Sequence, residues 1–152
     1  KSRNKKMSEQ KKYTVAAAII IDDKGRLLLQ KKDSGYRWKK NAWSMWGGHI
    51  KEGETPKEAM IREMKDETGL NEDEYTLEQI EDYVYEGHLV GMDIRMDHSM
   101  FLVTYTGSLA KIQLGEGGGF AFFEKDELPG LSMVDPTKEA VELYLKKHDT
   151  SM

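Results

Sequence analysis

Three acidic residues in the middle of the chain have a spacing that could place them on one side of a helix. Glu63, Asp66 and Glu67 stand at positions i, i+3 and i+4. At about 100° per residue, these carboxylates fall within an arc of roughly 100° on an α-helix. Like charges at this spacing repel one another and destabilise the helix. A hard divalent cation, which prefers oxygen ligands, would offset the repulsion.

Basic residues beside the acids support a second interpretation. Arg62, Lys57 and Lys65 supply opposite charges along the same segment. Mixed charges of this kind are typical of a solvated helix face. Spacing alone therefore leaves a metal site and a solvated acidic face both open.

The helix that carries these acids has recognisable ends. Thr55 stands at the N-cap position, Pro56 at the first helical position, and Glu58 three residues after the cap. This is a capping box with proline at the first position. Gly69 can adopt the left-handed conformation that closes a helix. The sequence therefore predicts a helix from about Pro56 to about Thr68.

A double glycine, Gly47-Gly48, precedes the helix. Two adjacent glycines let the backbone approach a bulky anion, because no Cβ atom is in the way. Gly48 and Gly53 have the separation of the Walker A motif, but Glu54 follows where that motif needs lysine. We therefore expect a metal ion, rather than a lysine ammonium, to meet a phosphate here.

Composition limits the class of protein. The chain has 152 residues, 38% of them hydrophobic, which is enough for one domain with a core. Its net charge of −4 predicts no attraction to long nucleic acids or membranes. It has no cysteine, so disulfides and thiolate sites are excluded. The apolar run from Val15 to Ile21 is too short to span a bilayer, and a cytoplasmic protein is expected.

The order of elements predicts an α+β (mixed) fold. Residues 1–12 are polar and basic, and we expect a disordered or artificial tail there, followed by one domain over residues 13–148. Apolar and alternating patterns predict sheet strands before and after the helix, and an amphipathic helix near the end. The predicted strands lie within residues 13–21, 26–30, 43–50, 76–89, 92–97, 99–106 and 120–123, and the last helix covers 136–147.

The central segment resembles the signature of the Nudix hydrolase family. Gly48 is followed by five residues and Glu54, then by seven residues and the run from Arg62 to Leu70. The match is in register, and its one departure is Asp66, where the family usually has glutamate. The resemblance implies an α/β/α sandwich with a central mixed β-sheet. It also implies hydrolysis of a nucleoside diphosphate linked to another group, by attack of water on phosphorus.

The resemblance also implies a site that uses Mg²⁺, with Mn²⁺ as a possible substitute. Glu63 and Glu67 would be direct metal ligands, and Gly48 would offer its carbonyl oxygen. Arg62 would hold the carboxylates and lower their pKa values. Glu54 would support the junction between loop and helix.

Two further acids are catalytic candidates by position. Asp66 is one methylene shorter than glutamate, so we expect it to reach a metal ion through water. Glu116, in a glutamate-glycine pair before an aromatic strand, is similar to a late-loop metal ligand or general base of the family. A surface acid in a glycine-rich loop explains Glu116 as well.

Aromatic residues near the double glycine could bind a base. Tyr36 and Trp38, which lie in a predicted loop, are stacking candidates beside Gly47 and Gly48. Trp43 and Trp46 fit a core role as well as a stacking role. The histidines show no ligand spacing and receive no role; they are His49, His88, His98 and His148.

Three functions remain open from the sequence. The first is hydrolysis of a (deoxy)nucleoside triphosphate, as in MutT. The second is hydrolysis of a nucleotide sugar, ADP-ribose or a dinucleoside polyphosphate. The third is a nucleotide-sensing module without turnover, although such modules commonly lose the acids that this chain retains. A small nucleotide is the expected partner, and a homodimer is possible without any sequence mark of an interface.

Overall fold

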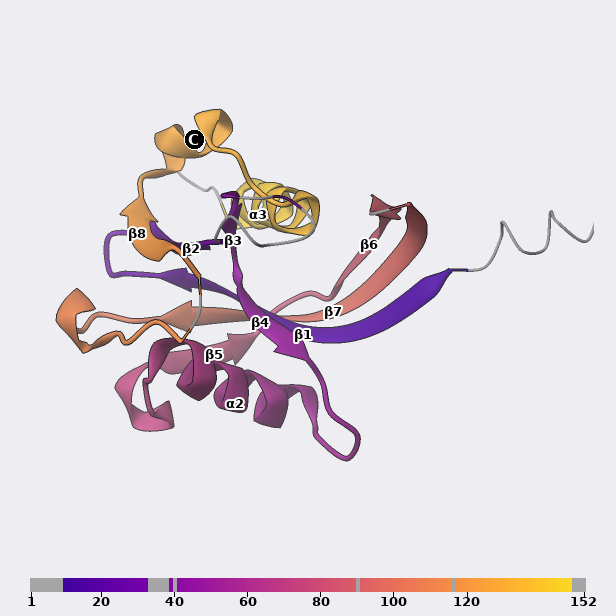
Figure 1. Cartoon of the computed structure of the whole chain (residues 1–152). Coiled ribbons are helices and arrows are strands. Elements are labelled where there is room, and N and C mark those ends of the chain that lie inside the picture. Colours follow the sequence, from indigo (N-terminus) through magenta and orange to yellow (C-terminus); the bar gives the residue numbers. More distant parts are fainter. Residues whose placement is uncertain (1–9, 33–38, 40, 90, 116, 149–152) are drawn as a thin grey trace, which may run out of the picture.

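The structure, a computed structural model, describes residues 10–32, 39, 41–89, 91–115 and 117–148. In these residues an eight-stranded sheet is covered by two α-helices (Figure 1). The strands are β1 (Lys11–Ile21), β2 (Leu27–Lys31), β3 (Trp43–Ser44), β4 (Trp46–His49), β5 (Thr76–Gln79), β6 (Tyr83–Leu89), β7 (Met92–Thr104) and β8 (Gly119–Phe123). The helices are α2 (Pro56–Thr68) and α3 (Asp135–His148), with 3₁₀ turns at Glu72–Glu74, Leu109–Lys111 and Lys125–Gly130.

Strand β1 organises the sheet. It pairs in parallel with β7 from Lys11↔Ile94 to Ile21↔Thr104. Its other edge pairs antiparallel with β4 and, at its C-terminal end, with β2. Strands β5 and β6 pair antiparallel with β7, and β8 pairs antiparallel with β2. The sheet is therefore mixed, as the sequence predicts.

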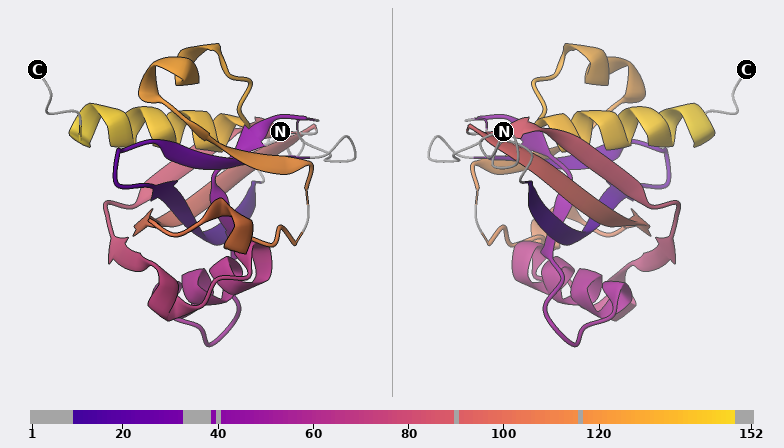
Figure 2. Two further views of the ribbon diagram at one scale, coloured as in Figure 1. Left: turned by 90° about the vertical axis from the view of Figure 1, so that its left-hand side faces the viewer. Right: turned by 90° about the vertical axis from the view of Figure 1, so that its right-hand side faces the viewer.

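The two helices lie on opposite faces of the sheet (Figures 1 and 2). Alternate β1 residues point to opposite faces. Ala16, Ala18 and Ile20 pack in the core under α2, whereas Ala17 and Ile19 pack in the core under α3. The expected α/β/α sandwich is confirmed. No helix in the described ranges is long and apolar enough to cross a membrane.

Several element boundaries differ from the predictions. The segments 92–97 and 99–106 form one strand, β7, because β1 pairs with it without a break. The segment 43–50 divides at Met45, because β3 pairs with β2 whereas β4 pairs with β1. Strand β1 begins at Lys11, two residues before the apolar run, because β7 supplies partners for Lys11 and Lys12.

Candidate active site

Helix α2 has the ends that the sequence predicts. Thr55 Oγ1 accepts a hydrogen bond of 3.1 Å from the Glu58 N–H, and Glu58 Oε1 accepts one of 2.9 Å from the Thr55 N–H. Gly69 has φ 77° and donates to the Lys65 carbonyl. Met60 and Met64 are fully buried against the sheet. These contacts set the rotation of α2, and they bring its acids beside the loop and strand that precede it.

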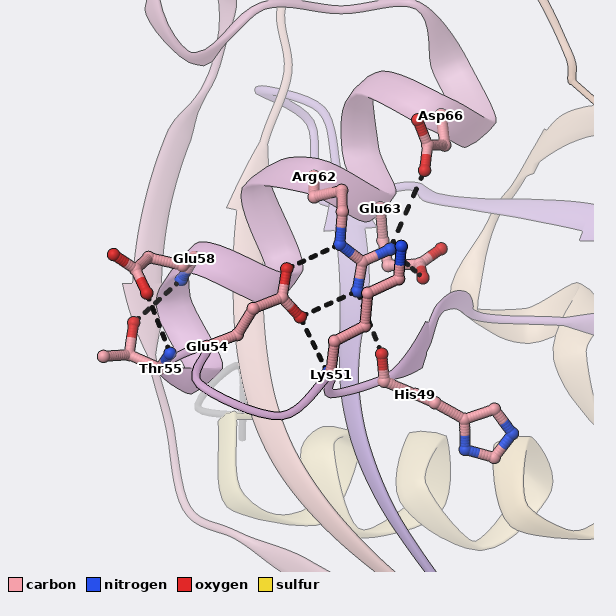
Figure 3. Close-up of polar contacts among 8 residues, drawn as sticks. All are labelled: His49, Lys51, Glu54, Thr55, Glu58, Arg62, Glu63 and Asp66. Atoms are coloured by element: carbon pink, nitrogen blue, oxygen red, sulfur yellow. Dashed lines mark hydrogen bonds and ion pairs between the residues drawn. The ribbon is translucent and has the colours of Figure 1, made fainter.

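The guanidinium of Arg62 lies at the centre of the polar cluster (Figure 3). Its Nε and Nη2 donate to the two oxygens of Glu54 at 2.6 and 2.9 Å. Nη1 donates to Glu63 Oε2 at 2.9 Å, and Nη2 also donates to the His49 carbonyl at 3.0 Å. Arg62 therefore joins α2 to the loop before it and orients Glu63.

Glu54 is held in its ionised form by this geometry. The hydrogen bonds from Arg62, together with the Lys51 N–H, lower the pKa of Glu54 to about 2. A planar guanidinium that meets both carboxylate oxygens gives a directional contact. This is the geometry expected of a residue that supports the loop–helix junction.

Glu67 lies in a different environment. Its Oε1 accepts a hydrogen bond of 2.9 Å from the Gly47 N–H. Burial, together with the charge of Glu63, raises the pKa of Glu67 to about 7, against the opposing effects of the Gly47 N–H and Lys32. Burial thus raises the pKa of Glu67 on α2, whereas the Arg62 guanidinium lowers the pKa of Glu54 in the loop before it.

Glu63 lies directly against the double glycine. A Cβ atom added to Gly48 would be 2.5 Å from Glu63 Oε2. At Gly47, with φ +138°, an added Cβ would be 2.7 Å from Ala17 Cα and closer still to the Ala16 carbonyl oxygen. Only glycine fits at either position without movement. The carboxylates of Glu63 and Glu67 therefore both reach the backbone of β4.

This donor set suits a hard divalent cation. Two carboxylates and the nearby Gly48 backbone are oxygen ligands of the kind that Mg²⁺ prefers. A cation would also offset the repulsion between Glu63 and Glu67 that contributes to the raised pKa of Glu67. Within the described ranges, no three acidic or histidine side chains are grouped closely enough to form a complete metal centre by themselves. A bound ion would need further ligands from water or substrate.

The other predicted residues fall into two groups. Asp66 is 62% exposed, and its carboxylate lies 3.7 Å from Arg62 Nη1. Tyr36, Trp38 and Glu116 lie outside the described residues. On either side of position 116, Gly115 donates to the Glu67 carbonyl at 3.1 Å, and a Cβ added to Gly117 would be 3.6 Å from Gln30 Oε1.

The two tryptophans with an open role lie on different parts of the sheet. Trp46 is fully buried, and its indole N–H donates to the Leu28 carbonyl at 2.8 Å. It belongs to the core and cannot stack on a ligand. The half-buried Trp43 ring packs edge-on against Phe123, with 4.8 Å between ring centroids.

A cavity of about 310 Å³ opens beside the double glycine, on the α3 side of the sheet. Its lining includes Val15, Met45, Gly48, Met96, His98 and Thr137. Sequence reasoning missed His98 and Thr137. The available signal for His98 was its place in the alternation of β7, where it lies on the same buried face as Met96 and Met100. A larger cavity of about 660 Å³ lies between the segment after β5 and the C-terminal half of α3, and none of the α2 acids lines it.

A comparison with known protein families shows which family the chain belongs to. The family model for the NUDIX domain matches residues 11–144. The chain belongs to the Nudix hydrolase family. Its Nudix segment runs from Gly48 to Leu70, and it supplies the second glycine of β4 and the α2 acids described above.

Relatives of this Nudix protein carry several names. It is 30% identical over 145 residues to an RNA pyrophosphohydrolase from Erythrobacter litoralis, covering 81% of this chain and 83% of that protein. It is 28% identical over 76 residues to an 8-oxo-dGTP diphosphatase from Proteus vulgaris, covering 47% of this chain and 62% of that protein. For other curated relatives the match spans much less of their length, for example 18% of Nudix hydrolase 5 from Arabidopsis thaliana and 16% of putative nudix hydrolase 1 from Caenorhabditis elegans.

Solved structures show the same fold at low sequence identity. A MutT protein from Methanosarcina mazei superposes with a TM-score of 0.70 and 17% identity, covering 93% of this chain and 98% of that one. At this level of identity the likeness establishes the fold and leaves the substrate open.

Proposed function

We propose that this Nudix protein is a Mg²⁺-dependent pyrophosphohydrolase that cleaves a nucleoside diphosphate linked to another group. The proposed preferred substrate is a (deoxy)nucleoside triphosphate. The observation that supports this proposal is the convergence of Glu63 and Glu67 on Gly47-Gly48, where a backbone without Cβ atoms meets two carboxylates. The adjoining cavity of about 310 Å³ is at the lower end of the usual range for small-molecule sites.

Each part of the site has a defined task in this proposal. Bound Mg²⁺ would neutralise the diphosphate and lower the pKa of the attacking water. Gly47 and Gly48 let the phosphates approach the sheet. Arg62 holds Glu63 in position, and Glu54 holds Arg62. The oxygen of water forms a bond to phosphorus and releases a proton to solvent, while the phosphoanhydride bond breaks and the leaving phosphate retains the bridging oxygen with the electron pair.

Protonation of Glu67 links metal binding to pH. A carboxyl group must lose its proton to ligate a metal ion. Because the pKa of Glu67 is about 7 without metal, a substantial fraction of the protein carries a proton there near neutral pH. Metal affinity, and with it activity, is therefore expected to rise as the pH increases through 7.

A second candidate substrate is the 5′ end of an RNA. The relative from Erythrobacter litoralis, which is matched over 83% of its length, is named an RNA pyrophosphohydrolase. The reaction would be the same, but the nucleotide would continue into a chain. The net charge of −4 gives no general attraction to the backbone of a long nucleic acid. The net charge therefore favours a small nucleotide as the substrate over an RNA.

The test is release of phosphate or pyrophosphate from a panel of substrates, with Mg²⁺ or with EDTA. The panel contains dNTPs, oxidised dGTP, nucleotide sugars, ADP-ribose, diadenosine polyphosphates and a short 5′-triphosphorylated RNA. We expect hydrolysis of a nucleoside triphosphate that stops with EDTA and falls at least about a hundredfold in Glu63→Gln and Glu67→Gln. Glu142→Gln, at an exposed position on α3, is the matched control and is expected to keep full activity.

Three other outcomes are informative. Faster hydrolysis of the RNA than of any free nucleotide would select the second candidate. Preference for a nucleotide sugar or a dinucleoside polyphosphate would keep the chemistry and change the substrate. Nucleotide binding without hydrolysis by the wild type, under all conditions, would overturn the enzyme proposal in favour of a sensing module.

A further inference from the structure

His98 is a buried polar side chain on the wall of the cavity beside the double glycine. It lies on β7, opposite Val15 of β1 and Tyr83 of β6, and it is 4% exposed. Its neighbours on the same face of β7 are Met96 and Met100. A buried polar group among apolar side chains destabilises the fold unless its hydrogen bonds are made.

The backbone around His98 determines which ring nitrogen carries the proton. Nδ1 lies 3.2 Å from the Tyr83 carbonyl oxygen and 3.2 Å from the Met96 carbonyl oxygen. Carbonyl oxygens only accept hydrogen bonds, so Nδ1 must carry the hydrogen. Burial lowers the pKa of His98, which favours the neutral ring. In that ring Nε2 has a lone pair and can only accept.

The other ring nitrogen, Nε2, makes no hydrogen bond to the described residues. In the described part of the chain, Tyr75 Oη is the one fully enclosed side-chain nitrogen or oxygen without a partner. Among the described residues Nε2 also has no partner and is not fully enclosed, so it retains accessible surface, and the cavity is the space that His98 lines.

Two other polar side chains of the cavity wall already have partners. Thr137 Oγ1 accepts from the Met45 N–H at 3.0 Å. Ser44 Oγ donates to the Met45 carbonyl at 2.9 Å, and it lies 3.4 Å from Thr137 Oγ1. These groups hold α3 against the segment between β3 and β4. His98 Nε2 is thus an uncommitted acceptor in a wall that also contains Val15, Met96 and Val134.

We propose that His98 is a specificity residue, and that its Nε2 accepts a hydrogen bond from the exocyclic amino group of a base in this cavity. An exocyclic amino group extends beyond the ring, so it can reach one recessed acceptor. The ring N–H of uracil lies between two carbonyl groups, and it would bring their lone pairs toward the same nitrogen. The selected class is therefore adenine, guanine or cytosine nucleotides. This inference rests on the proposed function, which places the phosphates at Gly47-Gly48.

The test uses pairs of triphosphates that differ only in the amino group. The pairs are ATP and purine riboside triphosphate, GTP and ITP, and CTP and pyrimidin-2-one riboside triphosphate. Equilibrium binding is measured with EDTA, and kcat/KM is measured with Mg²⁺. We expect the wild type to bind the amino-bearing member of at least one pair about three- to tenfold more tightly, the range of one neutral hydrogen bond.

Two variants of His98 separate recognition from structure. His98→Asn places an amide N–H where Nδ1 donates but has no atom at Nε2, so the amino preference is expected to fall to about one. His98→Gln places an amide oxygen near Nε2 but loses the donor to the two carbonyls, so the preference is expected to remain while the unfolding midpoint falls. A merely structural role would give the opposite order, with His98→Gln the more affected variant in every measurement.

The outcomes for this inference and for the proposed function are distinct. No amino preference in any wild-type pair, or an unchanged preference in His98→Asn, would overturn the role of His98 while hydrolysis still supports the enzyme. A preference in binding without any hydrolysis would support the role of His98 and overturn the enzyme. Failure to bind any nucleotide would overturn both.

Discussion

The backbone N–H of Gly47 donates a hydrogen bond of 2.9 Å to Oε1 of Glu67. This contact joins β4, which carries the double glycine, to the last turn of α2. It accounts for part of the local electrostatics, since it opposes the rise in the pKa of Glu67 that burial causes. The Glu67 carboxyl group therefore couples the double glycine of β4 to the acidic helix α2.

The first prediction concerns the pH dependence of stability. The pKa of Glu67 is raised from 4.5 to about 7 in the folded chain, so the folded state binds more protons than the unfolded state between these values. The contribution of Glu67 to stability is thus present below pH 4.5 and is lost as the pH rises through 7. Glu67→Gln removes this loss. Between pH 4.5 and pH 7, the free energy of unfolding of the variant should therefore increase relative to that of the wild type, by at most about 3 kcal/mol.

Urea unfolding at a series of pH values, in EDTA, measures this difference. Glu142→Gln serves as the control, and its stability curve should run parallel to the wild-type curve. A difference between Glu67→Gln and the wild type that does not change between pH 4.5 and 7 would contradict the prediction.

The second prediction concerns the metal ion. Mg²⁺ should raise the unfolding midpoint of the wild type, because a ligand that binds only the folded state stabilises it. The increase should be larger at pH 8 than at pH 6, since Glu67 must lose its proton to bind metal. EDTA should reverse it, and Glu67→Gln should reduce it at both pH values. An equal increase in Glu67→Gln would show that Mg²⁺ binds elsewhere.

The third prediction separates the two glycines. In Gly47→Ala, the new Cβ meets backbone atoms of β1 and the residue keeps a positive φ, so we expect a loss of more than about 2 kcal/mol in unfolding free energy. In Gly48→Ala, the Cβ meets the end of the Glu63 side chain rather than backbone, so we expect a smaller change in stability and at least about a tenfold loss in kcat/KM. Gly130→Ala, where an added Cβ has open space, is the control for both measurements. Equal losses of stability in Gly47→Ala and Gly48→Ala would contradict this prediction.

The fourth prediction compares Arg62 with Asp66. Lysine cannot reproduce both the bidentate contact of Arg62 with Glu54 and the hydrogen bond from Arg62 to Glu63. Arg62→Lys should therefore lower kcat/KM by about ten- to a hundredfold. Asp66 is mostly exposed and touches the cluster only at 3.7 Å. Asp66→Asn should therefore lower kcat/KM by less than about tenfold. Steady-state kinetics on the preferred substrate measures both losses. A larger loss in Asp66→Asn than in Arg62→Lys would contradict the prediction.

Some of this architecture is encoded over short stretches of sequence. The capping box at Thr55 and Glu58, and the left-handed Gly69, fix both ends of α2 through hydrogen bonds between residues three or four positions apart. The spacing of the acids follows from the helix itself. Alternating apolar residues likewise mark the strands, although they do not say where one strand ends and the next begins, as β7 shows.

The remaining features depend on contacts between segments far apart in the chain. Trp46 could be a core residue or a stacking residue until the sheet placed its indole against Leu28. Glu63 and Glu67 look alike in the sequence. Only the folded structure shows that Glu63 binds the Arg62 guanidinium, whereas Glu67 is buried. His98 shows no ligand spacing, and its proposed role rests on the β6 carbonyl beside Nδ1 and on its place in the cavity wall. Capping and periodicity act through neighbouring residues, whereas burial and protonation depend on which strands and helices pack together.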